Sequence, residues 1–195
     1  MRQLITLTED LADAFDRIEL SYAFGGALAN NYWGIVRTTV DVDCLVAIPA
    51  LKYQQFADEL AAIGCEMRDA SDKSLPVTAK PMRKQVEQQK LIELFCRTIR
   101  VELFVPFIPL QHEILRRAVQ MPLDKREVAV TSAEDLILLT LAFHRPKDIQ
   151  DVRGILWVQR EQLDLNYLKA WSEKTLPEDL QGELLALIQQ YANHG

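Results

Sequence analysis

Two aspartates one residue apart are the first residues in this chain whose types and spacing could do chemistry. Asp41 and Asp43 lie in the run RTTVDVDCLV, among β-branched and apolar residues that favour a strand. Because side chains alternate between the two faces of a strand, we expect both carboxylates on the same face. Two like charges so close repel each other unless a cation neutralises them. The spacing therefore predicts a site for a divalent metal ion.

A glycine pair is the second feature of this kind. Gly25 and Gly26 separate a predicted strand, SYAFGG, from a predicted short helix, ALANNYWG. Without side chains, glycines let the backbone N–H groups of a helix start approach a phosphate, which the helix dipole also attracts. Most such pairs are only turns, so this pair predicts nucleotide binding only together with the aspartates that follow it. Arg37 is predicted either to contact a phosphate or nucleotide edge or to cap the sheet from the surface.

The elements that must position these residues form a mixed pattern of strands and helices. Alternating residues predict a strand at 40–48 and a strand pair, KLIELFC with IRVELFVPF, and a short strand REVAV follows. Helical spacing and caps predict helices from Thr8 to about Arg17, at 50–64, after Pro109, from Ser132 and through the remainder. The polar segment 68–90 is predicted to be a mobile loop, either without regular structure or with one short strand. We expect an α+β domain at 1–130 and a helical region at 131–195 packed on it.

Composition narrows the class of protein. The chain has 195 residues, 49% of them hydrophobic, a formal net charge of -6 and a pI near 5.1. An acidic chain argues against a broadly basic nucleic-acid-binding face, so a nucleic-acid partner would have to be held locally. Three widely spaced cysteines predict neither a disulfide framework nor a zinc site, which indicates a reducing compartment. Without a signal-peptide core or a long apolar run, we expect a cytoplasmic protein with no membrane partner.

Three blocks of sequence in this order resemble a known superfamily. The blocks are YAFGGALANNYWGIVRTTVDVDCLV, IRVELFVP and SAEDLILLTLAFHRPKDIQDVRGIL, and with LDLNYLKAW they span most of Ser21 to Trp171. They resemble the nucleotidyltransferases of the DNA polymerase β-like fold, and most closely a bacterial branch that includes the AbiEii toxins and the DUF6036 group. The resemblance implies a mixed sheet flanked by helices, followed by a C-terminal helical bundle.

The resemblance also implies an activity and a set of site residues. It implies transfer of an NMP unit from an NTP to an acceptor, with tRNA as the acceptor, in a toxin-like or phage-defence protein that pairs with a cognate antitoxin. Asp41, Asp43 and Glu102 would then be catalytic carboxylates that bind Mg²⁺ or Mn²⁺, with Glu93 as the rival to Glu102. The residues implied in nucleotide binding are Gly25, Gly26, Arg37, Arg145, Lys147 and Asp148.

The chain departs from this family in two places. Thr140 stands where relatives commonly carry a lysine, and Glu102 stands where they carry an aspartate. A hydroxyl cannot replace the charge of a lysine, so the cationic role would pass to Arg145 or Lys147, or catalysis would be weak. Two alternatives therefore stay open: a catalytically impaired binding or antitoxin-like module, and a protein AMPylator, although the G-S and S-D-x-D signatures of minimal AMPylators are absent. Asp148 and Asp151 either contact substrate or only favour a helix N-terminus.

Overall fold

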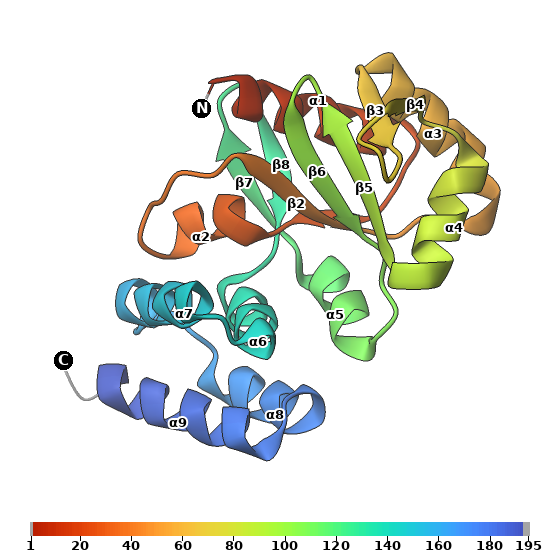
Figure 1. Ribbon diagram of the computed structural model, residues 1–195. Helices are drawn as coiled ribbons and strands as arrows, with labels where there is room; N and C mark the ends of the chain where they lie inside the picture. The colour runs from red at the N-terminus through yellow and green to blue at the C-terminus, as the bar shows by residue number, and fades with distance from the viewer. Residues whose placement is uncertain (1, 193–195) are drawn as a thin grey trace.

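The computed structural model describes residues 2–192, which form one mixed sheet surrounded by helices (Figure 1). The strands are β1 (Tyr22–Phe24), β2 (Asp41–Val46), β3 (Cys65–Arg68), β4 (Ser74–Pro76), β5 (Leu91–Cys96), β6 (Ile99–Phe104), β7 (Val119–Leu123) and β8 (Arg126–Val130). The helices are α1 (Arg2–Arg17), α2 (Gly26–Trp33), the short 3₁₀ helix η1 (Ala50–Lys52), α3 (Tyr53–Ala62), α4 (Ala79–Gln89), α5 (Pro109–Arg117), α6 (Ala133–Phe143), α7 (Pro146–Gln159), α8 (Leu165–Thr175) and α9 (Glu178–Ala192). The predicted α+β class is confirmed.

The strand order places the acidic strand near the middle of the sheet. The order is β4-β3-β5-β6-β2-β1-β8-β7. β2 is parallel to β6 and β1 is parallel to β8, while the other neighbouring strands are antiparallel. In this register Asp43 lies directly opposite Glu102 of β6, and Glu102 lies directly opposite Glu93 of β5.

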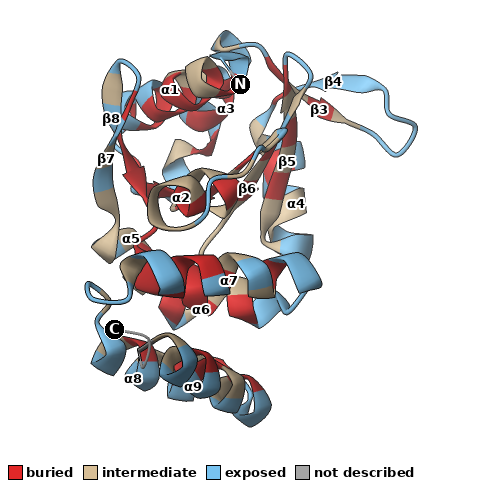
Figure 2. Ribbon diagram, turned by 90° about the vertical axis from the view of Figure 1, so that its left-hand side faces the viewer, coloured by how far each residue is buried: buried red, intermediate tan, exposed pale blue. Residues whose placement is uncertain are grey.

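The two faces of β2 differ as the alternation of its residues predicts. Asp41 and Asp43 are half-buried, whereas Val42 and Cys44 between and after them are buried. The apolar face joins the main core with α1 and α3, which pack against each other, and α3 in turn contacts α4. α2 and α5 each contact β2, and α2 also packs against α6 and α7. Figure 2 shows that the buried residues concentrate in the strands and on the inner sides of α1 and α6.

A buried polar network attaches the C-terminal helices. Ser132 caps α6, as predicted, by accepting a hydrogen bond from the amide of Asp135 at 3.2 Å. The carboxylate of Asp135 is fully buried and accepts hydrogen bonds from the Ser132 hydroxyl at 2.8 Å and the Tyr167 hydroxyl of α8 at 2.5 Å. Arg117 of α5 lies 3.4 Å from the same carboxylate. The predicted division into 1–130 and 131–195 stays a prediction, and this network crosses it.

Several predicted boundaries were wrong. α1 begins at Arg2 and not at Thr8, whose buried hydroxyl donates to the carbonyl of Leu4 at 2.9 Å inside the helix. A threonine can bond back along a helix as well as cap it, so its type alone did not mark the start. The segment 68–90 contains a short strand, β4, which is one of the two predicted alternatives, but also the unpredicted helix α4, which is anchored by Met82, buried in the core. β7 was not predicted because its sequence, VQMPL, contains a proline, which an edge strand tolerates.

The prediction of no disulfide was also wrong. Cys65 of β3 and Cys96 of β5 lie directly opposite each other, with Cα atoms 4.1 Å apart, and form a disulfide bond. Their sequence separation of 31 residues hid this pairing, which depends on β3 and β5 being neighbours. The cysteines therefore no longer support a reducing compartment, and the cytoplasmic location stays a prediction. Within residues 2–192, no helix combines the length and hydropathy that a membrane span requires.

Candidate active site

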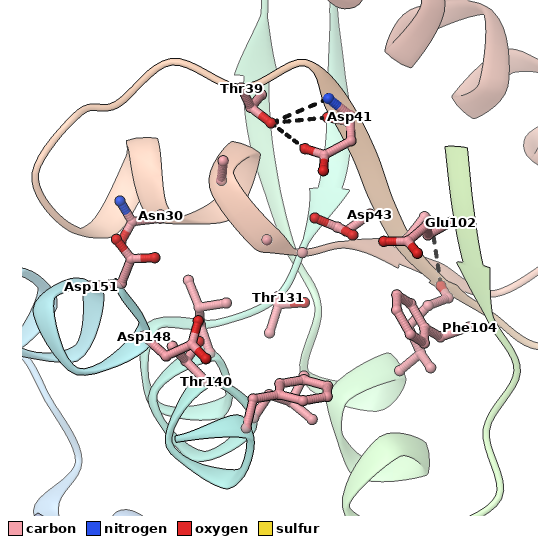
Figure 3. A pocket seen from close by; sticks show the side chains of 18 of the residues that line it. Asn30, Thr39, Asp41, Asp43, Glu102, Phe104, Thr131, Thr140, Asp148 and Asp151 are labelled. Atoms are coloured by element: carbon pink, nitrogen blue, oxygen red, sulfur yellow. Dashed lines mark hydrogen bonds between the residues drawn. The ribbon is translucent and has the colours of Figure 1, made fainter. Parts of the chain in front are cut away.

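A cavity of about 620 Å³ opens beside the acidic face of β2 (Figure 3). Its wall is formed by β2, β6, the start of α2, the segment before β2, and the facing parts of α6 and α7. All the residues that the sequence predicts for the metal and nucleotide sites line it: Gly25, Gly26, Arg37, Asp41, Asp43, Glu102, Arg145, Lys147 and Asp148. Their convergence comes from elements far apart in the chain, and their roles stay predictions.

The acidic residues of the cavity come from two adjacent strands. Figure 3 shows Asp41 and Asp43 on the same side of β2, as predicted, with Glu102 beside Asp43. Asp41 also accepts a short hydrogen bond from the Thr39 hydroxyl. Among the described residues, Glu102 lines the cavity and its rival Glu93 does not. The sheet register therefore presents three carboxylates to one cavity.

The electrostatics of Asp43 reflect this crowding. Burial is the largest cause that raises the pKa of Asp43, and the nearby charges of Asp41 and Glu102 add to it. A hydrogen bond with Glu102 raises the pKa further, whereas the positive charge of Lys147 lowers it, and the result is about 7. Burial and the two neighbouring acids therefore outweigh the effect of Lys147 on the pKa of Asp43.

Two features of the structure require a glycine at position 26: its backbone conformation and its close contact with Asp43. Its φ of +51° lies in the left-handed region, which residues with side chains rarely adopt. A Cβ atom at this position would also collide with the carboxylate of Asp43. By contrast, the amide of Gly25 donates to the carbonyl of Asp43 at 2.9 Å, so it serves the sheet and is not free to bind phosphate. The first-turn amides of α2 are the groups that can receive an anion.

Two of the four cationic residues of the cavity are held by acids of α7. The Nε and Nη2 atoms of Arg37, which form one edge of its guanidinium, donate to Asp151 at 3.2 and 3.0 Å. Arg145 contacts Asp148 at 2.7 and 3.1 Å, and the same aspartate accepts the Arg145 amide at 3.0 Å, which caps α7. Both aspartates therefore orient arginines, and Asp148 also has the helix-start role that the sequence left open. For Lys147, the described residues include no ion-pair partner.

Sequence reasoning missed some residues of the cavity. Arg100 lines it and contacts both Glu93 and Glu102, at 2.5 and 2.7 Å. The signal was present, because Arg100 and Glu102 are two residues apart in a predicted strand and so share a face. Thr140, which replaces the expected lysine, lines the cavity from α6. Thr39 was missed because the segment before β2 has no regular secondary structure from which to predict its direction.

The donor set of the cavity fits a hard divalent cation. Carboxylate oxygens are the ligands that Mg²⁺ prefers, and Asp41, Asp43 and Glu102 bring three carboxylates to this cavity. Among residues 2–192, no three His, Cys, Asp or Glu side chains are close enough to hold a metal ion by themselves. An ion here would therefore need further oxygens, such as those of a triphosphate.

Comparison with solved structures identifies the fold. The chain is similar to the antibiotic-resistance factor ANT(2'')-Ia in a solution structure (TM-score 0.54, 14% identity, 99% of both chains covered). It is also similar to the crystal structure of ANT(2'')-Ia in complex with adenylyl-2''-tobramycin (TM-score 0.52, 17% identity, 97% of this chain and 99% of that chain). A third neighbour is an antigenic nucleotidyltransferase-like protein from Paracoccidioides brasiliensis (TM-score 0.55, 16% identity, 97% of this chain and 93% of that chain).

These likenesses support the nucleotidyltransferase fold implied by the resemblance, and they show the fold alone. No protein-family model and no curated protein matches the chain. The AbiEii or DUF6036 branch stays a prediction.

The close approach of Gly26 to Asp43 predicts a difference between the two glycines. Gly26→Ala should lower the free energy of unfolding by about 1–3 kcal/mol, because it combines a left-handed backbone with a collision. Gly25→Ala is the matched control, since its added Cβ would meet only Thr131 Oγ1, at 3.8 Å. Urea unfolding checks both variants. Equal losses of stability would contradict the assigned geometry.

The raised pKa of Asp43 predicts a pH-dependent stability in metal-free buffer. Folded Asp43 binds its proton more tightly than unfolded Asp43, so its contribution to stability falls as pH rises from about 4 to about 7. Asp43→Asn removes this loss, and the gain in stability should grow by about 1–3 kcal/mol across that interval. Urea unfolding with a chelator at pH 5 and pH 8 measures it. The exposed Asp124→Asn serves as control, and a gain at Asp43 that is independent of pH would refute the explanation.

Proposed function

We propose that this chain is a metal-dependent nucleotidyltransferase that moves an NMP unit from an NTP to a hydroxyl of an acceptor, with release of pyrophosphate. The observation that carries the proposal is the convergence of Asp41, Asp43 and Glu102 with the start of α2 on one cavity. A divalent ion held by carboxylates, together with a helix start that receives phosphate oxygens, can neutralise the charge of a triphosphate. The similarity in fold to nucleotidyltransferases supports the same conclusion.

Asp41, Asp43 and Glu102 would hold Mg²⁺ or Mn²⁺. When bound, the ion would neutralise negative charge on the phosphate oxygens around the reacting phosphorus. Asp41 is oriented by its hydrogen bond from Thr39, and Asp43 is fixed against Gly26. These contacts hold two ligands on rigid backbone before any substrate arrives, which reduces the cost of ordering them.

The remaining cavity residues would bind and orient the nucleotide. The first-turn amides of α2 are placed to receive phosphate oxygens. Lys147 brings positive charge close enough to Asp43 to lower its pKa, so it can also attract the triphosphate. Arg37 and Arg145 are held by Asp151 and Asp148 and would present a guanidinium edge to the nucleotide.

For the acceptor, we retain tRNA, which the sequence resemblance implies, and with it a toxin-like or phage-defence role alongside a cognate antitoxin. A small-molecule acceptor is a second candidate, favoured by one observation. The cavity of about 620 Å³ has the size of small-ligand pockets. One structural neighbour, ANT(2'')-Ia, is seen with an adenylylated aminoglycoside.

The experiment incubates the purified protein with each labelled NTP, Mg²⁺ or Mn²⁺, and either total tRNA or an aminoglycoside. We expect the wild type to produce labelled acceptor. Asp43→Asn should lower the rate of transfer by at least about 10²-fold, because losing a metal ligand weakens ion binding and leaves the charge on the phosphate less neutralised. Asp124→Asn, an exposed acid in the β7–β8 turn, should keep full activity. NTP binding without transfer to tRNA, aminoglycoside or protein would refute the enzyme and favour the binding module, and labelled protein would indicate an AMPylator.

The replacement of the family lysine by Thr140 predicts where the positive charge now comes from. Lys147 lines the same cavity and acts on Asp43, so Lys147→Ala should slow transfer by about 10²–10³-fold. Thr140→Lys should then add little. Lys169→Ala, an exposed lysine of α8, is the matched control. Single-turnover rates measure the effect. If Lys147→Ala kept full activity and Thr140→Lys accelerated transfer, Lys147 would not have replaced the family lysine, and the wild type would lack that positive charge.

A further inference from the structure

The acidic residues of the sheet form a row that extends beyond the cavity. Glu93, Glu102 and Asp43 lie directly opposite one another on β5, β6 and β2, and we call these three residues the acidic row. Like charges directly opposite each other on neighbouring strands destabilise a sheet. The row therefore needs positive charge even in the protein without ligands.

Arg100 supplies positive charge to this row. Its Nη2 lies 2.5 Å from Glu93 Oε2 and 2.7 Å from Glu102 Oε1, and its Nε donates to the same Glu93 oxygen at 3.0 Å. Arg100 also lies directly opposite Asp41 in the parallel register of β2 and β6. The hydrogen bond with Glu93, and the charges of Glu102 and Asp41, raise the pKa of Arg100. One guanidinium is thus surrounded by acids of three strands.

This arrangement divides the carboxylate of Glu102 between two neighbours. Oε1 lies 2.7 Å from Arg100 Nη2, while Asp43 lies directly opposite Glu102 on the neighbouring strand β2. Among the described residues, no three acids come together as a metal cluster. A guanidinium remains charged at all ordinary pH values, so Arg100 cannot leave by losing its proton.

We propose that Arg100 occupies the place of a second cation in the carboxylate array and limits the site to one divalent ion, bound by Asp41, Asp43 and the side of Glu102 that faces Asp43. The inference rests on the proposed metal-dependent function. Sites that hold two ions place them about 3.5–4 Å apart between shared carboxylates. Here the side of Glu102 that a second ion would need is taken by the guanidinium of Arg100, 2.7 Å away. Arg100 is therefore a positioning residue that sets the number of ions.

The test counts bound Mn²⁺ by electron paramagnetic resonance of the free ion, with a non-hydrolysable NTP analogue present. Wild type should bind one Mn²⁺ per chain. Arg100→Gln, which removes the charge, should bind two, and Arg100→Lys, which keeps it, should bind one. Arg97→Gln is the matched control, because Arg97 lies in the same β5–β6 hairpin but pairs with Asp10 outside the row. Melting temperatures confirm that each variant is folded.

The outcomes separate this inference from the proposed function. Two ions in wild type would overturn the role of Arg100 and leave a metal-dependent transferase intact. One ion in both wild type and Arg100→Gln would also overturn it, since the charge would then not determine the count. If neither protein bound Mn²⁺, the metal site itself would be wrong, and the inference would be overturned with it.

Discussion

The central constraint on this structure is the repulsion among carboxylates that the sheet register forces together. The parallel pairing of β2 with β6 places Asp43 directly opposite Glu102. Asp41 lies two residues earlier on the same face of β2, opposite Arg100. Burial, and then the charges of Asp41 and Glu102, raise the pKa of Asp43 to about 7, so its ionised form costs stability in the absence of ligands. Proteins keep groups of this kind where a cation or a charged substrate later offsets the cost, so the unfavourable charge is itself an argument for function.

The surrounding backbone is built to tolerate this crowding. The missing side chain of Gly26 leaves the space that the Asp43 carboxylate occupies, and the same residue starts α2. The side chain of Asn31 then bonds both the amide and the carbonyl of Arg37, at 2.8 and 3.0 Å, while α7 holds the guanidinium through Asp151. The acidic strand, the helix start and the C-terminal helices are thereby fixed relative to one another around one cavity.

Much of this arrangement could be predicted from local sequence, and the remainder depended on long-range pairing. The alternation in VDVD predicted that both aspartates lie on one face of the strand. The order of the motifs favoured Glu102 over Glu93, and Glu102 is the one that lines the cavity. Long-range pairing could not be predicted from local patterns. The bond between Cys65 and Cys96 and the position of Arg100 between acids of different strands both follow from the strand order. Likewise α4 was missed, because its polar sequence is anchored in the core mainly by Met82.

The central claim is that the acidic face of β2 binds a divalent ion together with a nucleoside triphosphate. Anomalous diffraction from crystals grown with Mn²⁺ and a non-hydrolysable NTP analogue tests it most directly. The account predicts an anomalous peak in direct coordination with Asp41 and Asp43, with phosphate oxygens completing the ion's coordination and lying near the start of α2. A nucleotide bound elsewhere, or a nucleotide in this cavity with Mn²⁺ absent from both aspartates, would contradict it.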